Sequence, residues 1–311
     1  MRGVCAKLAI SALVLAGAAT GMGALARWWP LADMPNHFTP FLFALAAAGL
    51  ILLPFGELRH LARRSMRSAL GLGLAGVAAI NAAPLHSSLA TTAVAAPGRA
   101  DTLTVVSFNV WSRNAQLDEA ARWLLAQNAD VIVLQEMTRL NREPIRRALA
   151  ATHPNIHDCN CNDIVMYSRR PWVAADGQPR SGTQPALSWL TLADGSGREL
   201  RVVGLRPRYM KDPETYAAHY DWLVRNIPKF GDRLILVGDF NAVPWSWQMQ
   251  RLVAATGLRR HGTYEASWPS YLPMLLIDNL LTTPDIGAVS FRTGPPLGSD
   301  HRPVVATVAL P

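Results

Sequence analysis

The chain has 311 residues, half of them apolar, and a formal net charge of +8. Residues 1–100 hold 8 Lys/Arg and 2 Asp/Glu, whereas residues 101–311 hold 22 and 20. Residues 101–311 therefore have a net charge of only about +2. This excludes a domain that binds nucleic acid through a strongly basic overall charge, although a local basic patch remains an alternative.

Three stretches of the first hundred residues are almost without charge: Leu8–Ala26, Phe38–Phe55 and Ser68 to about Ala96. Each has or approaches the roughly 20 apolar residues that a membrane-spanning helix needs. The first alone would also fit a cleaved signal peptide, because Arg2 and Lys7 precede it. However, two further apolar stretches follow it, and none of the three has the polar face of a helix in a soluble bundle. The pattern therefore favours three transmembrane helices.

The flanking charges predict how these helices are oriented. The loop between the second and third stretches carries Arg59, Arg63, Arg64 and Arg67, and the N-terminus is also basic. By the positive-inside rule both lie in the cytoplasm. After three crossings, everything from about residue 100 lies on the outer side.

Beyond a linker of small residues at 91–101, apolar strands alternate with helices. The expected elements are a strand at 103–108, a helix at 114–129, a strand at 131–134, a helix at 212–227, a strand at 235–237, a helix at 246–257, and strands at 275–283 and 304–310. This interleaving predicts a layered α/β or α+β sandwich.

Three cysteines are present. Cys159 and Cys161 form the sequence CNC, which is too little for a tetrahedral zinc site without other ligands. An oxidising outer compartment would allow a disulfide between them, although so short a loop is strained. We assign them no function.

The segment ILVGDFNAVP, residues 235–244, begins as a buried strand and ends in polar residues. Asp239 and Asn241 are two residues apart, so in an extended chain both side chains point to the same side. A simple turn is the alternative, because Gly, Asp, Asn and Pro are the usual turn residues.

The same pattern recurs along the chain. Five apolar strands contain, or lie next to, an acid, an amide or a histidine: Asn109; Glu136; Asp239 with Asn241; Asp278; and Asp300 with His301. This recurrence predicts a shared polar floor at one edge of the sandwich. Oxygen ligands without cysteine favour Mg²⁺ or Mn²⁺ over zinc, and a histidine among carboxylates suits proton transfer beside a metal.

The motifs SFNVW, DVIVLQE, VGDFNAVP, IDNLL and GSDHRPV, in this order, resemble those of the endonuclease/exonuclease/phosphatase superfamily. Its members include deoxyribonucleases, abasic-site endonucleases, sphingomyelinases and inositol-polyphosphate phosphatases. The resemblance covers about residues 102–310, and three membrane helices before such a domain resemble bacterial membrane-anchored members. It implies a membrane region with linker at 1–100 and a catalytic domain at 101–311.

The resemblance also implies a fold and a reaction: a four-layered α/β sandwich, with two packed mixed sheets flanked by helices, that cleaves phosphate esters with a metal. By motif, Asn109, Glu136 and Asp300 belong to the metal site. Asp239 orients or deprotonates the attacking water, and Asn241 stabilises the phosphorane oxygens. His301, oriented by Asp278, contacts the phosphate or acts as a base.

One position departs from the family pattern. Arg206, in VVGLRPRY, stands where the family usually has His or Tyr. Arginine can bind a phosphate bidentately but cannot give up a proton near neutral pH. We therefore expect Arg206 to bind substrate, at the expense of a general acid worth about 10²- to 10⁴-fold in rate.

Two functions follow as hypotheses. The first is a membrane-anchored, metal-dependent phosphodiesterase, nuclease or phosphatase, in a bacterial inner membrane with its catalytic domain on the periplasmic side. The second is a catalytically attenuated binding or scaffold module of the same fold, favoured only by Arg206. Nucleic acid, phospholipid head groups and small phosphoesters are all open as substrates, and no protein partner is indicated.

The predicted topology can be tested with fusions. We expect alkaline phosphatase attached to the C-terminus to be active, because that enzyme folds only outside the cytoplasm. The same reporter attached within the loop at 56–67 should be inactive. The reverse pattern would overturn the orientation.

Overall fold

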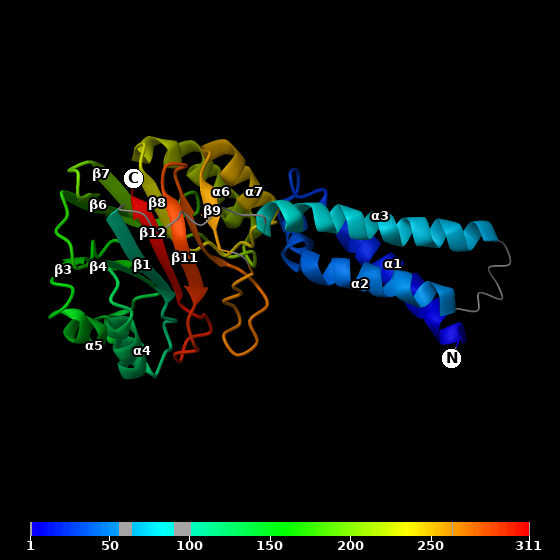
Figure 1. Cartoon of the computed structure of the whole chain (residues 1–311), viewed down its shortest axis with the longest axis horizontal. Helices are drawn as coiled ribbons and strands as arrows, with labels where there is room; N and C mark the ends of the chain where they lie inside the picture. Colours follow the sequence, from blue (N-terminus) through cyan, green and yellow to red (C-terminus); the bar gives the residue numbers. More distant parts are fainter. Residues whose placement is uncertain (1, 56–63, 90–100, 263, 311) are drawn as a thin grey trace. The chain divides into compact units, whose positions relative to one another are not determined.

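The computed structural model describes residues 2–55, 64–89, 101–262 and 264–310. By contacts the chain divides into two compact units, one of residues 1–90 with 244–247, the other of residues 91–243 and 248–311 (Figure 1). Arg59 and Arg63 of the basic loop, and most of the predicted linker, lie outside the described residues.

The first unit consists of three long helices and short 3-10 turns. The helices are α1 (Arg2–Gly23), α2 (Thr39–Leu52) and α3 (Arg64–Leu89), and the turns are η1 (Pro30–Asp33), η2 (Pro35–Phe38) and η3 (Leu53–Phe55). Three segments are long and apolar enough to cross a membrane, Val4–Gly23, Pro30–Phe55 and Ser68–His86. They agree with the three predicted stretches.

Small residues let these helices approach one another. Ala9, Ala12 and Ala16 of α1 are buried against α2 and α3. A Cβ atom at Gly49 would lie 3.0 Å from the Cβ of Ala12, so a larger residue there would push the helices apart. Close packing through small residues is the usual way in which helices associate in membranes. Large apolar side chains such as Ile51 remain exposed, as expected of surfaces that face lipid.

The second unit is built on two six-stranded mixed sheets. The first has the order β11 (Gly287–Thr293), β12 (Val304–Leu310), β1 (Asp101–Asn109), β2 (Val131–Gln135), β4 (Val165–Ser168), β3 (Asn155–His157). The second has the order β5 (Ala174–Gln178), β6 (Ala186–Ala193), β7 (Glu199–Arg206), β8 (Leu234–Asp239), β10 (Asp278–Thr282), β9 (Arg259–His261). Strands β1 and β2 are parallel, as are β7 and β8; the other pairs are antiparallel.

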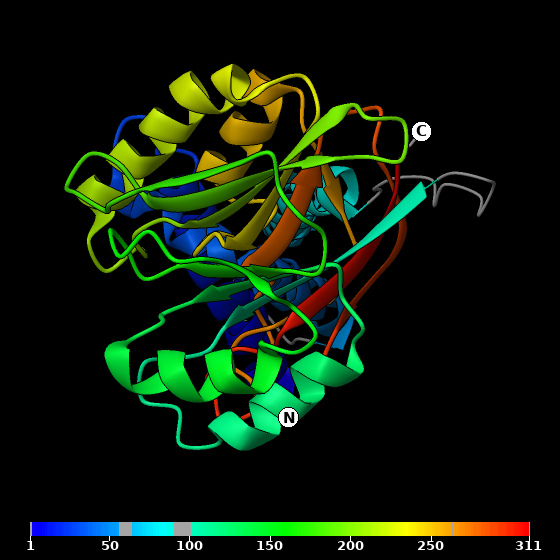
Figure 2. The same ribbon diagram turned by 90° about the vertical axis from the view of Figure 1, so that its left-hand side faces the viewer.

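Helices cover the outer face of each sheet, which gives four layers (Figure 2). Helices α4 (Leu117–Ala126) and α5 (Arg139–Leu149) pack on the first sheet. Helices α6 (Pro213–Asn226) and α7 (Trp247–Thr256), with the turn η4 (Ile227–Phe230), belong to the second. The predicted four-layered α/β sandwich is therefore confirmed.

A central core joins the two sheets. Val105 and Val133 of the first sheet pack with Val202, Ile235 and Val237 of the second, all buried. Strand β8 is buried along its whole length, because one face meets this core and the other meets α6 and α7. Its continuous apolar run is the pattern expected of a strand covered on both faces.

Several elements were not predicted from the sequence. These are β3 to β7, α5, β9 and β11. The short strand β5 has the sequence AADGQ and is held by its pairing with β6 rather than by any strand propensity of its own. Strand β10 begins at Asp278, three residues later than the apolar run that predicted it.

Gly238, directly before Asp239, has a φ angle of +151° and pairs with Leu205 of β7. A Cβ atom there would lie 2.2 Å from the carbonyl oxygen of Leu205, so only glycine lets β7 and β8 approach.

We expect Gly238→Ala to cost about 1–3 kcal/mol of stability, as overpacking does. The measurement is the thermal unfolding midpoint of the purified chain in detergent. Gly182→Ala is the matched control, because no described atom beyond its two chain neighbours lies within 4 Å of its Cβ position. Equal midpoints for the two variants would contradict this explanation.

Candidate active site

The predicted polar residues meet at one edge of the two sheets. Asn109 ends β1, Arg206 ends β7 and Asp239 ends β8. The first residue of β10, Asp278, is paired with Asp239 in the antiparallel register of β8 and β10. The carboxyl ends of three strands and the start of a fourth thus bring distant parts of the chain together.

Asn109 lies at the centre of this cluster. Its amide nitrogen donates to Glu136 Oε1 at 3.2 Å and to Asp239 Oδ2 at 3.0 Å, and lies 3.4 Å from His301 Nε2. Its amide oxygen accepts the backbone N–H of Trp111 at 3.1 Å. One buried side chain therefore links residues from both sheets.

His301 is held between two carboxylates. Its Nδ1 lies 2.8 Å from Asp278 Oδ2, and its Nε2 lies 3.9 Å from Asp239 Oδ2. The hydroxyl of Ser267 donates to the same oxygen of Asp278 at 2.5 Å. Ser299 fixes the backbone, because its hydroxyl donates to the carbonyl of Asn109 at 2.7 Å and accepts the N–H of His301.

Burial and charge perturb both partners of this pair. Burial by itself would lower the pKa of His301, but Asp278 and Asp239 outweigh it and raise that pKa above the ordinary histidine value. Burial raises the pKa of Asp239 above its usual range, although the positive charge on His301 works against this. The cluster therefore favours a protonated imidazole beside buried carboxylates.

Arg206 is enclosed by acids. Its Nη2 lies 2.6 Å from Glu136 Oε1, its Nη1 lies 2.6 Å from Asp163 Oδ2, and its Nε lies 3.9 Å from Asp239 Oδ2. Burial opposes ionisation of Glu136, yet Arg206 and Asn109 hold the pKa of that carboxyl below its usual value. The guanidinium is thus the counter-ion of the acids on this side of the cluster.

Asn241 and Asp300 complete the predicted set. Asn241 donates its backbone N–H to Asp239 Oδ1 at 2.9 Å and its side-chain amide to Asp239 Oδ2 at 3.1 Å. Asp300 accepts the indole N–H of Trp268 at 3.3 Å. Its other oxygen, Oδ1, is buried and has no hydrogen-bond partner among the described residues.

The backbone is unusual where it presents these side chains. Glu136 and Asn241 have φ angles of +57° and +50°, values that residues other than glycine rarely adopt. Backbone strain of this kind persists where surrounding contacts enforce it, and it clusters at functional sites.

Two charged residues of the cluster were missed from the sequence. Asp163 precedes β4, and Arg180 follows β5. The Nη2 of Arg180 lies 3.4 Å from Asp163 and 3.3 Å from the carbonyl oxygen of Arg206. In the sequence, Asp163 is marked only by its position next to the apolar run IVMY. The other acids of the cluster also border apolar strands.

The cluster fits a divalent cation. Five carboxylates, those of Glu136, Asp163, Asp239, Asp278 and Asp300, meet here with only two arginines and one histidine. Acceptor oxygens of Asp278 and Asp300 are buried without a hydrogen-bond partner in the described chain. Asp239, Asp278 and His301 also offer ligand atoms within 4.8 Å of one another.

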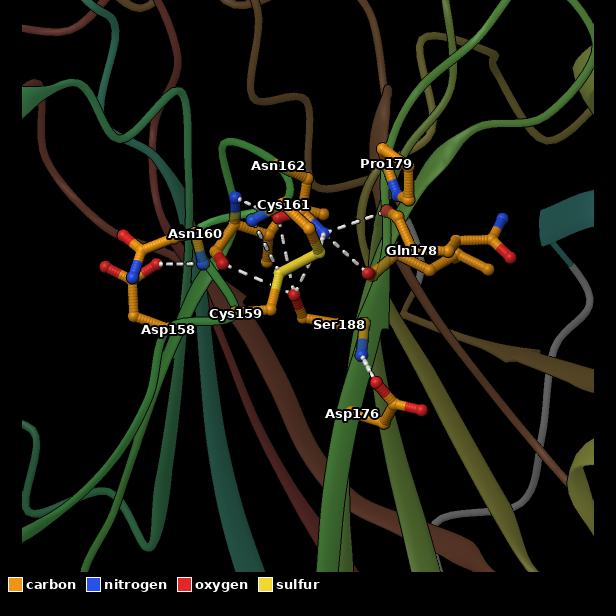
Figure 3. The surroundings of a disulfide bond; sticks show 12 residues. Asp158, Cys159, Asn160, Cys161, Asn162, Asp176, Gln178, Pro179 and Ser188 are labelled. Carbon is orange, nitrogen blue, oxygen red and sulfur yellow. Dashed lines mark hydrogen bonds between the residues drawn. A yellow bond between two sulfur atoms is a disulfide. The ribbon is translucent and has the colours of Figure 1, made fainter.

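The two cysteines of CNC form a disulfide between Cys159 and Cys161 (Figure 3). It lies in the loop from β3 to β4 that leads to Asp163. Asn162, the residue before Asp163, donates its side-chain amide to the carbonyls of Gln178 and Leu187 at 2.9 and 2.7 Å. The loop is therefore tied to the second sheet next to the acid that holds Arg206.

A comparison with family models matches residues 106–301 to the Endonuclease/Exonuclease/phosphatase family. A search of curated proteins found no match.

Solved structures share the fold at low identity. A member of this family from Bacteroides thetaiotaomicron has 14% identity and a TM-score of 0.58, covering 69% of this chain and 100% of its own. Sphingomyelinase C from Streptomyces griseocarneus has 16% identity and a TM-score of 0.51, covering 67% and 99%. TDP2 from D. rerio, complexed with a single-strand DNA product, has 15% identity and a TM-score of 0.54, covering 67% and 99%.

The charge pairing in the cluster leads to a titration experiment. Asp278→Asn should lower the pKa of His301, because it removes the carboxylate that raises this pKa most. The measurement is an NMR titration of the imidazole signals in EDTA, with His301→Gln used to identify the resonance. Asp176→Asn, a change in β5 that leaves the cluster intact, is the control. An unchanged His301 titration in Asp278→Asn would show that the pair is not electrostatically coupled.

Proposed function

The chain belongs to the endonuclease/exonuclease/phosphatase family, and on that premise we propose that it is a membrane-anchored, metal-dependent phosphoesterase that acts outside the cytoplasm. The observation that carries this proposal is the continuous contact network from Glu136 through Asn109 and Asp239 to His301. Hydrolysis of a phosphate ester needs a base for water, donors for the phosphate oxygens and a cation. This edge supplies candidates for each.

Asp239 is the proposed base. Its carboxylate is buried, and both of its oxygens accept hydrogen bonds, from Asn109 and from Asn241. These donors fix the orientation of the Asp239 carboxylate. A water molecule that binds next to the cluster would therefore find the proposed base in a defined position. Because burial raises its pKa, Asp239 is a stronger base than an exposed aspartate.

His301 and Asn241 are the proposed donors to the phosphate. Asp278 holds His301 Nδ1 at 2.8 Å, which leaves Nε2 directed toward Asp239 and the reacting group. A protonated imidazole there would hydrogen-bond a phosphate oxygen as negative charge grows on it, and could pass its proton to the leaving oxygen. Asn241 would add a second, neutral donor.

Glu136 and Asp300 would hold the metal, and Asn109 would join them by turning its amide so that the oxygen replaces the nitrogen that now faces Glu136. The unpartnered, buried Oδ1 of Asp300 is the clearest vacant acceptor among them. Mg²⁺ or Mn²⁺ suits such an oxygen donor set, and when bound it neutralises charge on the phosphate and favours deprotonation of water.

Arg206 is the proposed phosphate-binding residue. Its Nη1 and Nη2 are each fixed by a carboxylate, while its Nε is buried without a hydrogen-bond partner among the described residues. Because Nε lies on the side of Asp239, a phosphate oxygen near the base would find this N–H already oriented. Asp163 pairs with the Nη1 of Arg206, and Arg180 donates to the carbonyl oxygen of Arg206.

The three apolar helices and the flanking charges support a membrane anchor and a catalytic domain on the periplasmic side of a bacterial inner membrane. The substrate class can be determined by measuring hydrolysis of a panel of phosphate esters. The similarity in fold to a sphingomyelinase C and to a protein crystallised with a DNA product argues for including phospholipid head groups and nucleic acid beside small phosphoesters.

One observation favours the second hypothesis, a module that binds without turnover. The contact of Arg206 with Glu136 Oε1 occupies an oxygen that the metal would need. If this ion pair persists in the presence of metal, the metal would bind weakly and hydrolysis would be slow.

Metal dependence tests the proposal directly. We expect the full-length protein, treated with EDTA and dialysed, to lose hydrolysis of the panel substrate that it cleaves, and Mg²⁺ or Mn²⁺ to restore it. Calcium at the same ionic strength controls for charge screening. Full activity in excess EDTA would rule the proposal out, and no hydrolysis of any panel substrate under any metal would support the binding module.

Arg206 can be tested by two substitutions. Arg206→Ala should raise KM and lower kcat, because a buried charged donor to the phosphate is lost. Arg206→His restores the residue usual in the family. If the wild type is slow for want of an acid, this change should raise kcat and add a pH dependence in the range where histidine titrates. If Arg206 is a phosphate clamp, kcat should fall. Unchanged kinetics in both variants would mean that Arg206 does not touch substrate.

A further inference from the structure

A polar cavity lies beside helix α5, and no residue of the proposed catalytic cluster lines it. Its volume is about 440 Å³, within the range of small-molecule sites. One wall is α5, and the others come from strands β3 and β4 and the disulfide loop between them. We call it the α5 cavity.

Three arginines of α5 line this cavity: Arg139, Arg142 and Arg146. Their spacing of three and four residues puts them on one face of the helix. Arg142 is already engaged, with Asp158 at 3.2 Å and the carbonyl oxygen of Asn162 at 2.8 Å. Arg139 and Arg146 make no ion pair or side-chain hydrogen bond with any residue that the structure describes.

The acids of the cavity do not neutralise these two arginines. Asp158 is paired with Arg142. Glu143 also lines the cavity, but its carboxylate lies toward Arg147, 3.9 Å from that guanidinium. Two positive charges are therefore left over on the wall, which matches a doubly charged anion such as a phosphate monoester.

The floor of the cavity is apolar except for one hydroxyl group. Val165 and Tyr167 are 1% exposed, and Ile156 is half-buried beside them. The side chain of Tyr167 is buried and lines the cavity, and its hydroxyl forms no hydrogen bond with any residue that the structure describes. Burial raises the pKa of Tyr167, so this group is a neutral O–H donor. A hydroxyl that lines the cavity without a protein partner can donate its hydrogen bond to an acceptor on a ligand.

The disulfide holds the rim. Cys159 and Cys161 are bonded, and two of the residues that line the cavity, Asp158 and Asn160, lie on one side of this bond, whereas Gln178 lies on the other (Figure 3). Asn160 also accepts a hydrogen bond from Arg142 at 3.2 Å. The rim residue Asn160 is therefore held by the disulfide loop on one side and by Arg142 on the other.

From these contacts we propose that the α5 cavity binds a small organic phosphate, with its phosphate group on Arg139, Arg146 and the Tyr167 hydroxyl and its apolar part on Ile156 and Val165. This site is separate from the catalytic edge and does not depend on the proposed phosphoesterase activity. Its ligand is a bound effector or a remote part of a larger substrate.

The test uses phenylphosphonate, which has a dianionic head, an aromatic body and a carbon–phosphorus bond that a phosphoesterase does not hydrolyse. Binding to the full-length protein in detergent is measured by calorimetry in EDTA. We expect binding to the wild type and to Asp239→Asn alike, and weaker binding of inorganic phosphate. The double variant Arg139→Gln/Arg146→Gln should bind at least tenfold more weakly, and Tyr167→Phe should bind measurably more weakly.

Arg225→Gln is the control, because Arg225 is an exposed arginine of α6 that does not line the cavity, and its loss leaves Glu143 paired with Arg147. If Arg225→Gln weakens binding as much as the double variant does, only general charge attraction is at work and the proposal fails. It also fails if Asp239→Asn abolishes binding, since the probe would then lie at the catalytic edge, or if the wild type does not bind phenylphosphonate at all.

Discussion

The site depends on how buried negative charge is compensated. Five carboxylates meet at one edge of the sandwich, and two of them, Asp239 and Asp278, are buried, which is costly unless each is paired or hydrogen-bonded. Arg206 compensates Glu136 and Asp163, and a protonated His301 compensates Asp278 and Asp239. The remaining excess of negative charge is what a divalent cation would neutralise. Clustering these carboxylates therefore costs folding stability. A site that binds a cation and a phosphate ester would explain why the chain brings them together.

The fold supplies the geometry that this charge cluster needs. The carboxyl ends of β1, β7 and β8 lie at the same edge, and the close approach of Gly238 to Leu205 brings Asp239 beside Arg206. Left-handed backbone at Glu136 and Asn241 turns both side chains inward as the chain leaves its strands. The large core between the two sheets provides the stability against which this local strain can be held.

The sequence predicted those features of the fold and the site that depend on short motifs or on long apolar runs. The three long apolar helices and the layered sandwich could be predicted because hydrophobic length and alternation are local properties. The sequence also suggested that Asp239, Asp278 and His301 share one edge, since each borders an apolar strand. It was uninformative for β3 and β5, whose short polar sequences form strands only by pairing with a neighbour. Asp163 and Arg180 were missed for a related reason, because their roles arise from contacts between segments distant in the chain.

The central claim is that Asp239 activates water for the hydrolysis of a phosphate ester at this edge. The most direct measurement is kcat of Asp239→Asn with saturating Mg²⁺ or Mn²⁺, on the panel substrate that the wild type cleaves. This substitution preserves the size of the side chain and its hydrogen bond to the backbone N–H of Asn241. Loss of the base should lower kcat by about 10²- to 10⁴-fold in a variant whose thermal unfolding midpoint shows that it is folded at the assay temperature. A variant that folds normally and retains kcat within a few-fold of the wild type would contradict the account.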